Sequence, residues 1–179
     1  MAVKALLLGS IMLAFSIPQM GQAETQSALA LPDGPVMLKV KGDIARTNIS
    51  TGTGDNGEEA HFDREMLQSL PQHAFETGTP WTEGTSHYSG PLMRTLLEHL
   101  GAEGESVHVL ALNGYEADIP LRDFYDYDVI LTLERDQKAI PIREYGPLWV
   151  LYPFDQNEEL LSEKIRFRAV WQVMQINVH

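Results

Sequence analysis

The chain has 179 residues, no cysteine and a formal net charge of −12 at pH 7. A field of that sign repels phosphate backbones and anionic headgroups, so nucleic-acid binding and attachment to a lipid surface are excluded as expected functions. The length fits one domain with a core of its own, and the lack of cysteine excludes disulfides and thiolate metal ligands.

The first residues have the pattern of a secretory signal peptide. Lys4 precedes an apolar run over 5–17, and the small residues Gly21 and Ala23 stand before Glu24. These are the basic start, the hydrophobic stretch and the small residues of a cleavage site. A membrane anchor is the alternative, but it needs about 20 apolar residues. We therefore expect cleavage of residues 1–23 and, since the exported chain lacks cysteine, a periplasmic location without insertion in the membrane.

The remaining chain divides into a short tether and one domain. Residues 24–35 predict a tether with a turn at Asp33-Gly34, and residues 36–179 predict a single domain. The domain opens with alternating apolar residues over 36–44, which favour a strand.

A polar, glycine-rich stretch over 45–61 has no periodicity and predicts a loop. Its glycines spell GxGxxG over 52–57, but a dinucleotide site needs a strand directly before this motif and a helix directly after it. His61, Asp63 and Glu65 lack the ligand spacing of a known metal motif. We expect neither a nucleotide site nor a metal site here.

Two helices carry clear boundary signals. Asp63 is placed to cap a short helix to Leu70, which Pro71 ends. The second helix is predicted over 90–101, with Gly90 as the cap, Pro91 in the first turn and a glycine at the far end. Its leucines at positions 92, 96, 97 and 100 form one apolar stripe.

The rest of the chain predicts mainly strands. Asn113-Gly114 and Asp136-Gln137 are expected hairpin turns, and 157–164 has room for one or two helical turns. The predicted strands are 107–111, 115–121, 129–135, 138–142, 148–152 and 167–178. The sum is an α+β fold, mainly β, of mixed sheets with short flanking helices.

The segment from Phe75 to Gly84, FETGTPWTEG, is the first candidate for a ligand site. Trp81 stands there among hydroxyls and carboxylates, which suits the face and edges of a planar polar heterocycle. Coverage of the end of a sheet is the alternative role for this indole. Trp149 and Trp171 lie in apolar runs, so we expect both to pack in the core.

Five segments resemble a known family in their order and spacing. They are SGPLMRTLLEHLGA, ALNGYEADIPL, DVILTLERDQKAIP, YGPLWVLYP and RAVWQVMQI. Together they resemble the molybdopterin-binding domain of the sulfite oxidase family, in which one cysteine thiolate holds the molybdenum. Since this chain has no cysteine, the resemblance implies a pterin-shaped pocket without the metal.

The size, the signal peptide, the TPWT loop and the GPLWVLYP strand are similar to a narrower group of that family. These are small exported proteins without cysteine that bind reduced pterins without metal. They regulate a membrane-bound cyclic-di-GMP synthase/phosphodiesterase through its periplasmic domain. The resemblance implies a non-catalytic pterin sensor. The alternatives are a molybdenum-cofactor oxidoreductase that lacks the cysteine ligand, and an interaction module without a ligand.

For a pterin, Trp81 would supply a stacking face and a carboxylate would accept from the amino group and the adjacent ring N–H. Either Glu76 or Asp155 would be that carboxylate. The other polar edges would fall to Thr77, Thr79, Asn113 and Tyr115.

Overall fold

The structure is a computed structural model that describes residues 29–52 and 57–179. The expected signal peptide, the start of the tether and part of the glycine motif lie outside these residues. Within the two described ranges, no helix is long and apolar enough to cross a membrane.

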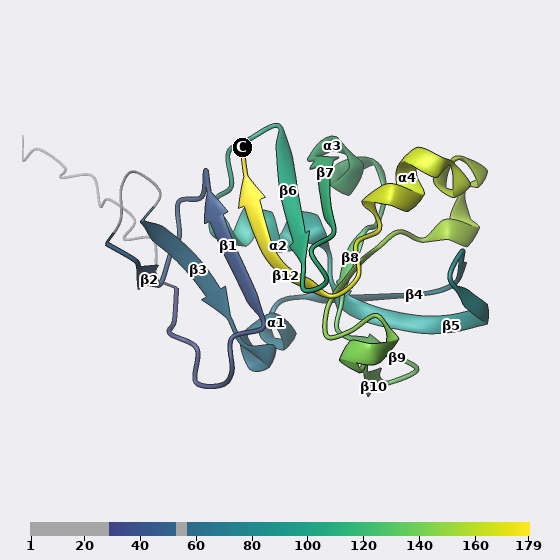
Figure 1. Cartoon of the computed structure of the whole chain (residues 1–179), viewed down its shortest axis with the longest axis horizontal. Coiled ribbons are helices and arrows are strands. Elements are labelled where there is room, and N and C mark those ends of the chain that lie inside the picture. The colour runs from purple at the N-terminus through teal and green to yellow at the C-terminus, as the bar shows by residue number, and fades with distance from the viewer. Residues whose placement is uncertain (1–28, 53–56) are drawn as a thin grey trace, which may run out of the picture.

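The largest sheet has six strands and is mixed. Its first and last strands in the chain, β1 (Leu38–Gly42) and β12 (Val173–Val178), are parallel neighbours at its centre, while the other pairs are antiparallel. Across the sheet the order is β2 (Ile49–Ser50), β3 (Glu58–Phe62), β1, β12, β6 (Ser106–Ala111) and β7 (Glu116–Pro120). Figure 1 shows this sheet beside a long hairpin that forms the other half of the molecule.

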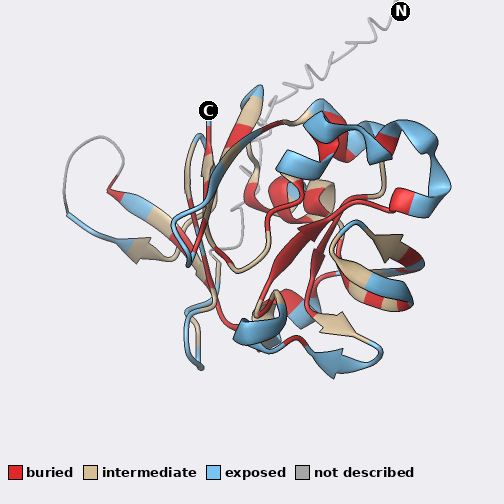
Figure 2. Ribbon diagram, turned by 45° about the vertical axis from the view of Figure 1, so that its right-hand side comes forward, coloured by how far each residue is buried: buried red, intermediate tan, exposed pale blue. Residues whose placement is uncertain are grey.

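That hairpin consists of β4 (Gln72–Thr79) and β5 (Thr82–Pro91). Two short strands, β9 (Glu134–Arg135) and β10 (Lys138–Ala139), extend it to a sheet of four. A separate pair, β8 (Ile130–Thr132) with β11 (Trp149–Leu151), is buried at every residue. Buried residues fill the interior between these sheets, and exposed residues cover the peripheral helices and turns (Figure 2).

The helices are short and lie around the sheets. The four α-helices are α1 (Arg64–Ser69), α2 (Met93–Leu100), α3 (Arg122–Asp126) and α4 (Glu163–Arg168). Three 3-10 turns, η1 (Ile142–Glu144), η2 (Phe154–Gln156) and η3 (Glu158–Leu161), complete the described elements. In Figure 1, α4 lies at the end of the molecule away from β1 and β3.

Several predicted elements are confirmed. The fold is α+β and mainly β, and Asp63 caps α1. Gly101 ends α2 with a φ of 61°, and the leucines at 96, 97 and 100 are buried. Asn113-Gly114 joins β6 to β7, and Asp136-Gln137 joins β9 to β10 with both residues at positive φ.

The predicted loop over 45–61 was wrong because strands lie in it, and no strand was predicted over 75–84, where a hairpin lies. The stretch over 45–61 contains β2 and most of β3. In β3 the buried Ala60 and Phe62 alternate with the polar residues Glu59 and His61. The segment 75–84 belongs to the β4–β5 hairpin, whose polar and glycine-rich sequence hid its strand pairing.

Two predicted boundaries also change. Gly90 and Pro91 end β5 instead of starting α2, and Leu92 is the residue before the helix. Gly90 lies so close to β8 that a Cβ atom there would overlap the carbonyl oxygen of Leu131, a tertiary contact invisible in local sequence. The predicted strand over 167–178 begins only at Val173, because α4 extends to Arg168.

Asp63 fastens the start of the domain to α1. One carboxylate oxygen accepts from the Met66 amide at 2.9 Å, and the other accepts from the amides of Asp33 and Gly34 at 2.8 Å each. The described end of the expected tether is therefore bound to the domain. The backbone amide of Met66, followed by that of Gly34, lowers the pKa of Asp63 below its ordinary value of 3.8.

We predict that Asp63→Asn lowers the free energy of unfolding at neutral pH, because an amide nitrogen would face an N–H donor. A lowered pKa in the folded state adds stability above the unfolded pKa, and this is lost as the pH falls through the folded value. The deficit of the variant should therefore shrink as the pH falls below about 4. Urea unfolding at a series of pH values measures the difference in stability between the variant and the wild type. Asp43→Asn, at an exposed aspartate, is the control. A deficit that is constant with pH would contradict the prediction.

Candidate ligand-binding site

All three tryptophans of the chain meet in one aromatic cluster. The Trp81 ring centroid lies 5.3 Å from that of Trp171 and 5.9 Å from that of Trp149. Trp149 and Trp171 are 6.5 Å apart. These separations are those of favourable edge-to-face and tilted aromatic pairs. Trp149 is fully buried, which confirms its core role, whereas Trp81 and Trp171 are half-buried above it.

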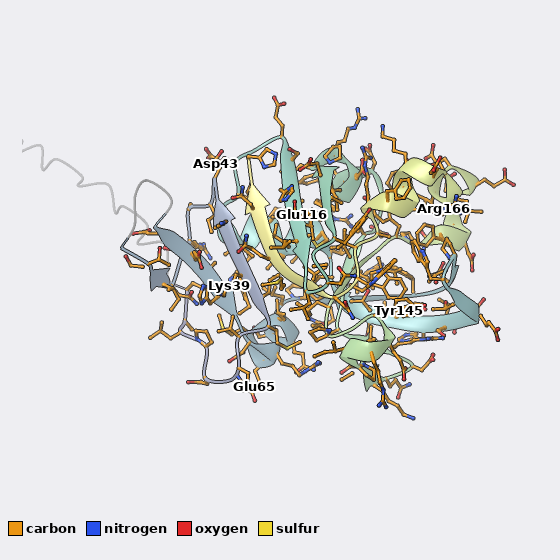
Figure 3. All side chains as sticks on the ribbon, in the orientation of Figure 1. Lys39, Asp43, Glu65, Glu116, Tyr145 and Arg166 are labelled. Atoms are coloured by element: carbon orange, nitrogen blue, oxygen red, sulfur yellow. The ribbon has the colours of Figure 1, made fainter. Side chains whose placement is uncertain are left out.

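Tyr145 fixes the cluster from the side. Its ring stacks on Trp149 at 4.9 Å with an interplanar angle of 25°, and its hydroxyl donates to the carbonyl oxygen of Trp81 at 2.8 Å. Figure 3 shows Tyr145 in the half of the molecule that also carries Arg166, away from Lys39 on β1. Stacking and the hydrogen bond together hold the Trp81 turn against β11.

The turn that carries Trp81 is closed by threonine hydroxyls. Thr79 Oγ1 accepts from the amides of Trp81 and Thr82 at 3.2 and 3.1 Å, and it also shares a 2.8 Å hydrogen bond with the Thr82 hydroxyl. The Trp81 ring then packs edge-on against Phe154 at 5.8 Å. The indole is thus held in place from both its backbone and its ring.

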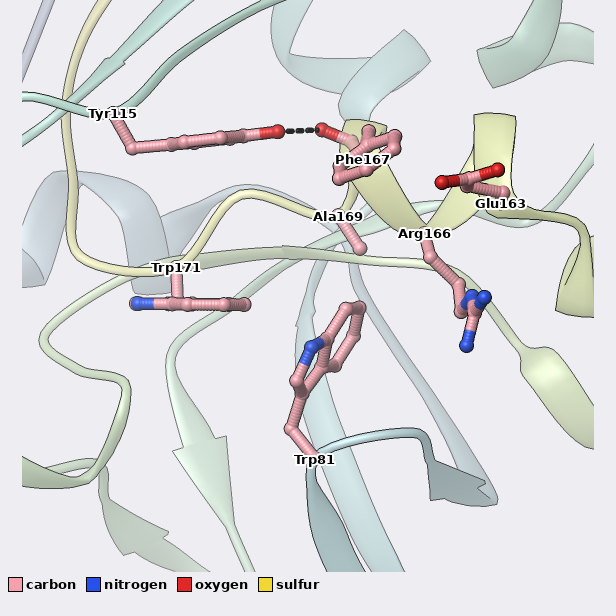
Figure 4. Close-up of a pocket in the computed structure, with 7 residues that line it drawn as sticks. All are labelled: Trp81, Tyr115, Glu163, Arg166, Phe167, Ala169 and Trp171. Carbon is pink, nitrogen blue, oxygen red and sulfur yellow. Dashed lines mark hydrogen bonds between the residues drawn. The ribbon is translucent and has the colours of Figure 1, made fainter.

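Above the cluster lies a pocket of about 300 Å³, a size at the lower end for small-molecule sites. Its lining residues are Trp81, Tyr115, Glu163, Arg166, Phe167, Ala169 and Trp171. In Figure 4 the rings of Tyr115 and Trp171 lie roughly parallel on opposite sides of the pocket, and Trp81 stands beside Trp171. We call the space between Tyr115 and Trp171 the aromatic slot. Its shape suits a flat ring.

One wall of the slot is tied to α4. The Tyr115 hydroxyl donates to the carbonyl oxygen of Phe167 at 2.7 Å, and the Tyr115 amide donates to Asn113 Oδ1 at 2.9 Å. Burial raises the pKa of Tyr115 above its ordinary value of 10, so its hydroxyl remains a donor to pH values well above neutral. The β6–β7 turn and α4 therefore form one wall together.

The polar end of the pocket is formed by Glu163 and Arg166, both exposed side chains of α4. A buried ion pair sets the position of this helix, because Arg168 donates to Asp123 at 2.6 Å. Tyr152 donates to the same carboxylate at 3.0 Å. Burial, then the charge of Asp123, raises the pKa of Tyr152 well above its ordinary value.

The structure brings two of the seven residues proposed for the site, Trp81 and Tyr115, to this pocket. Thr77, Thr79 and Asp155 instead bind the backbone around the hairpin: Gly78 N donates to Asp155 Oδ2 at 2.6 Å, and Asp155 N donates to Thr77 Oγ1 at 3.0 Å. Glu76 and Asn113 are exposed and are not among the lining residues.

Sequence reasoning missed the contribution of α4 and the segment after it. Trp171 was assigned to the core, and Glu163, Arg166 and Phe167 were assigned no role. No local pattern marks these residues, since their meeting with Trp81 depends on tertiary packing. The one available signal was the position of Phe167, a large apolar residue between two arginines.

The donor atoms near the pocket do not fit the metal of a molybdenum cofactor. The chain has no cysteine to supply a thiolate.

Unpaired polar atoms lie beneath the aromatic cluster. Among the described residues, the side-chain polar atoms of Tyr88, Thr132 and Trp149 are buried without a hydrogen-bond partner. Thr132 and Trp149 are direct partners across β8 and β11, and the Tyr88 ring lies 5.9 Å from that of Trp149. Burial of one such group without a partner costs about 1–3 kcal/mol. These three groups therefore lower the free energy of unfolding.

The fold and this pocket define a mixed-sheet domain with an aromatic site between a hairpin and a short helix. Residues 57–154, more than half of the chain, match the family of the oxidoreductase molybdopterin binding domain. The chain belongs to this family. No curated protein sequence matches it significantly.

A solved structure with the same fold is that of the sulfane dehydrogenase SoxCD from Paracoccus pantotrophus. The TM-score is 0.57 and the sequence identity is 17%, over 79% of this chain. The match covers 37% of the SoxCD chain, so this chain spans well under half of that protein. The likeness confirms the predicted fold.

We predict that Trp149→Ala lowers the free energy of unfolding by about 3–5 kcal/mol, because it leaves a cavity under the cluster. Trp149→Phe should cost much less, since it retains a ring and removes an unpaired N–H. Chemical unfolding followed by far-UV circular dichroism compares the two. Equal losses in both variants would show that the indole nitrogen has a partner.

Proposed function

We propose that this chain is an exported, non-catalytic protein that binds a reduced, metal-free pterin. In this proposal it regulates a membrane-bound cyclic-di-GMP synthase/phosphodiesterase through the periplasmic domain of that partner. The observation that carries the proposal is the aromatic slot between Tyr115 and Trp171. The chain belongs to a molybdopterin-binding family but has no cysteine of its own.

A pterin matches the slot in shape and in the distribution of its polar groups. Its flat bicyclic ring can stack between Tyr115 and Trp171, and each stacking contact is worth about 0.5–1.5 kcal/mol beyond burial. Trp81 lies beside Trp171 and lines the same pocket. The polar edges of the heterocycle would then face Glu163 and Arg166 at the end of the pocket.

Regulation requires that the loaded and empty proteins differ in affinity for the partner. The slot offers a physical route, because its outer wall is also surface. Tyr115 and Phe167 are 40% and 58% exposed, and Leu112 beside the same turn is 48% exposed. A ring bound under Tyr115 would add contacts to the β6–β7 turn and so change the surface that a partner meets.

The export step rests on the pattern of residues 1–23, which lie outside the described residues. The acidic net charge favours a neutral or basic partner surface. The family description also favours a second candidate, an oxidoreductase with an intact molybdenum cofactor. That candidate requires an oxygen ligand or an open position where the family has a thiolate, and it predicts bound molybdenum.

We predict that protein purified from a native periplasm releases about one pterin per chain on denaturation and contains no stoichiometric molybdenum. Fluorescence of the supernatant measures the pterin, and elemental analysis measures the metal. Molybdenum at one atom per chain would overturn the proposal and favour the oxidoreductase. If neither is found, and added reduced pterin does not bind, the proposed function is wrong.

We predict that Tyr115→Ala weakens pterin binding about 2- to 10-fold, because one stacking face is lost. Tyr115→Phe should bind nearly as well as the wild type, since it retains the ring. Titration of the quenching of tryptophan fluorescence measures both affinities. Tyr125→Ala, at an exposed tyrosine of α3 outside the pocket, is the matched control. An unchanged affinity in Tyr115→Ala would exclude the slot as the binding site.

A further inference from the structure

Glu163 and Arg166 form a matched pair of hydrogen-bonding groups at one end of the slot. They stand three residues apart on α4, a spacing that places two side chains on the same face of a helix. Glu163 can only accept hydrogen bonds when it is ionised, and Arg166 can only donate. Within residues 29–52 and 57–179, neither side chain has a hydrogen bond or an ion pair, so both are available to a ligand.

The carboxylates expected to read the ligand are placed elsewhere. The carboxylate of Asp155 is already bound to the Gly78 amide, and both of its oxygens lie against the backbone there. Glu76 is exposed on β4 and does not line the pocket. Among the described residues that line the pocket, Glu163 is the one carboxylate.

We propose that Glu163 and Arg166 select heterocycles with a 2-amino-4-oxo pyrimidine edge. This edge presents an amino N–H, a ring N–H and a carbonyl oxygen in a row. The carboxylate of Glu163 accepts from both N–H groups, and the guanidinium of Arg166 donates to the carbonyl oxygen. The inference rests on the proposed function, because it names the chemical feature by which the same slot recognises a pterin.

The pair also rejects a closely related ring. In a 2,4-dioxo heterocycle a second carbonyl replaces the amino group, so an acceptor faces the Glu163 carboxylate and a hydrogen bond becomes a repulsion. Hydrogen bonds to charged groups are stronger than neutral ones. Since Glu163 is exposed to solvent, we expect discrimination of about 10-fold, toward the lower end for such a contact.

The test compares two probes of nearly the same size and shape, pterin and lumazine, which differ in the group at position 2. Dissociation constants for both are measured by calorimetry on the exported chain, stripped of bound ligand. The wild type should bind pterin about 10-fold more tightly than lumazine. Glu163→Gln should bring the two affinities close together, because an amide can donate to the second carbonyl as well as accept.

Two further variants distinguish loss of recognition of the pyrimidine edge from a general loss of binding. Glu158→Gln removes a carboxylate from η3, outside the pocket, and should leave both affinities unchanged. Arg166→Gln should weaken both probes by a similar factor, because both carry the carbonyl at position 4. The preference for pterin should survive in that variant.

Equal binding of the two probes by the wild type would overturn the inference and leave the aromatic slot as a binding site. The same conclusion follows if Glu163→Gln keeps the preference of the wild type. If neither probe binds to the wild type and a reduced pterin also fails, the proposed function falls, and the inference falls with it.

Discussion

The contact among three indole rings is the interaction on which the site depends. Trp81 comes from the turn of the β4–β5 hairpin, Trp149 from the buried strand β11, and Trp171 from the segment that precedes β12. These segments are distant in the sequence and belong to different sheets. Trp149 belongs to the buried core, while Trp81 and Trp171 pack on it and line the pocket, so the same packing stabilises the fold and shapes the site.

A second constraint fixes the polar end of the pocket. The buried pair of Asp123 and Arg168 joins α3 to α4, and the hydroxyl of Tyr152 satisfies a further acceptor site on the same carboxylate. A buried ion pair adds little net stability, because desolvation offsets the attraction. Its consequence here is geometric, because it joins the helix that carries Glu163 and Arg166 to α3.

Local signals in the sequence predicted the elements that depend on local interactions. The cap at Asp63, the stripe of α2 and the turn at Asn113-Gly114 each follow from hydrogen bonds or periodicity within a few residues. The β4–β5 hairpin was not predicted because glycine and threonine alternate in its sequence without an apolar period. The role of Gly90 was not predicted because its close approach to β8 is a tertiary contact.

The residues of the candidate site also differ in whether the local sequence could identify them. Trp81 and Tyr115 could be found because each is a large aromatic beside a turn, where a side chain has little core to fill. Asp155 was a reasonable choice of acceptor by its place after a strand, but the Gly78 amide occupies its carboxylate. Glu163 has no distinguishing neighbours in the sequence. Its meeting with the slot requires α4 to be folded against the β6–β7 turn.

Pterin binding and molybdenum chemistry depend on different groups, so a domain of this family can lose one and retain the other. Stacking and edge contacts hold the ring, while a soft thiolate holds the metal. In this chain the thiolate is absent and the aromatic slot is present. Tyr115 both lines the pocket and is 40% exposed at the surface. In the proposed function, this exposed face of Tyr115 is where a partner would distinguish the loaded protein from the empty one.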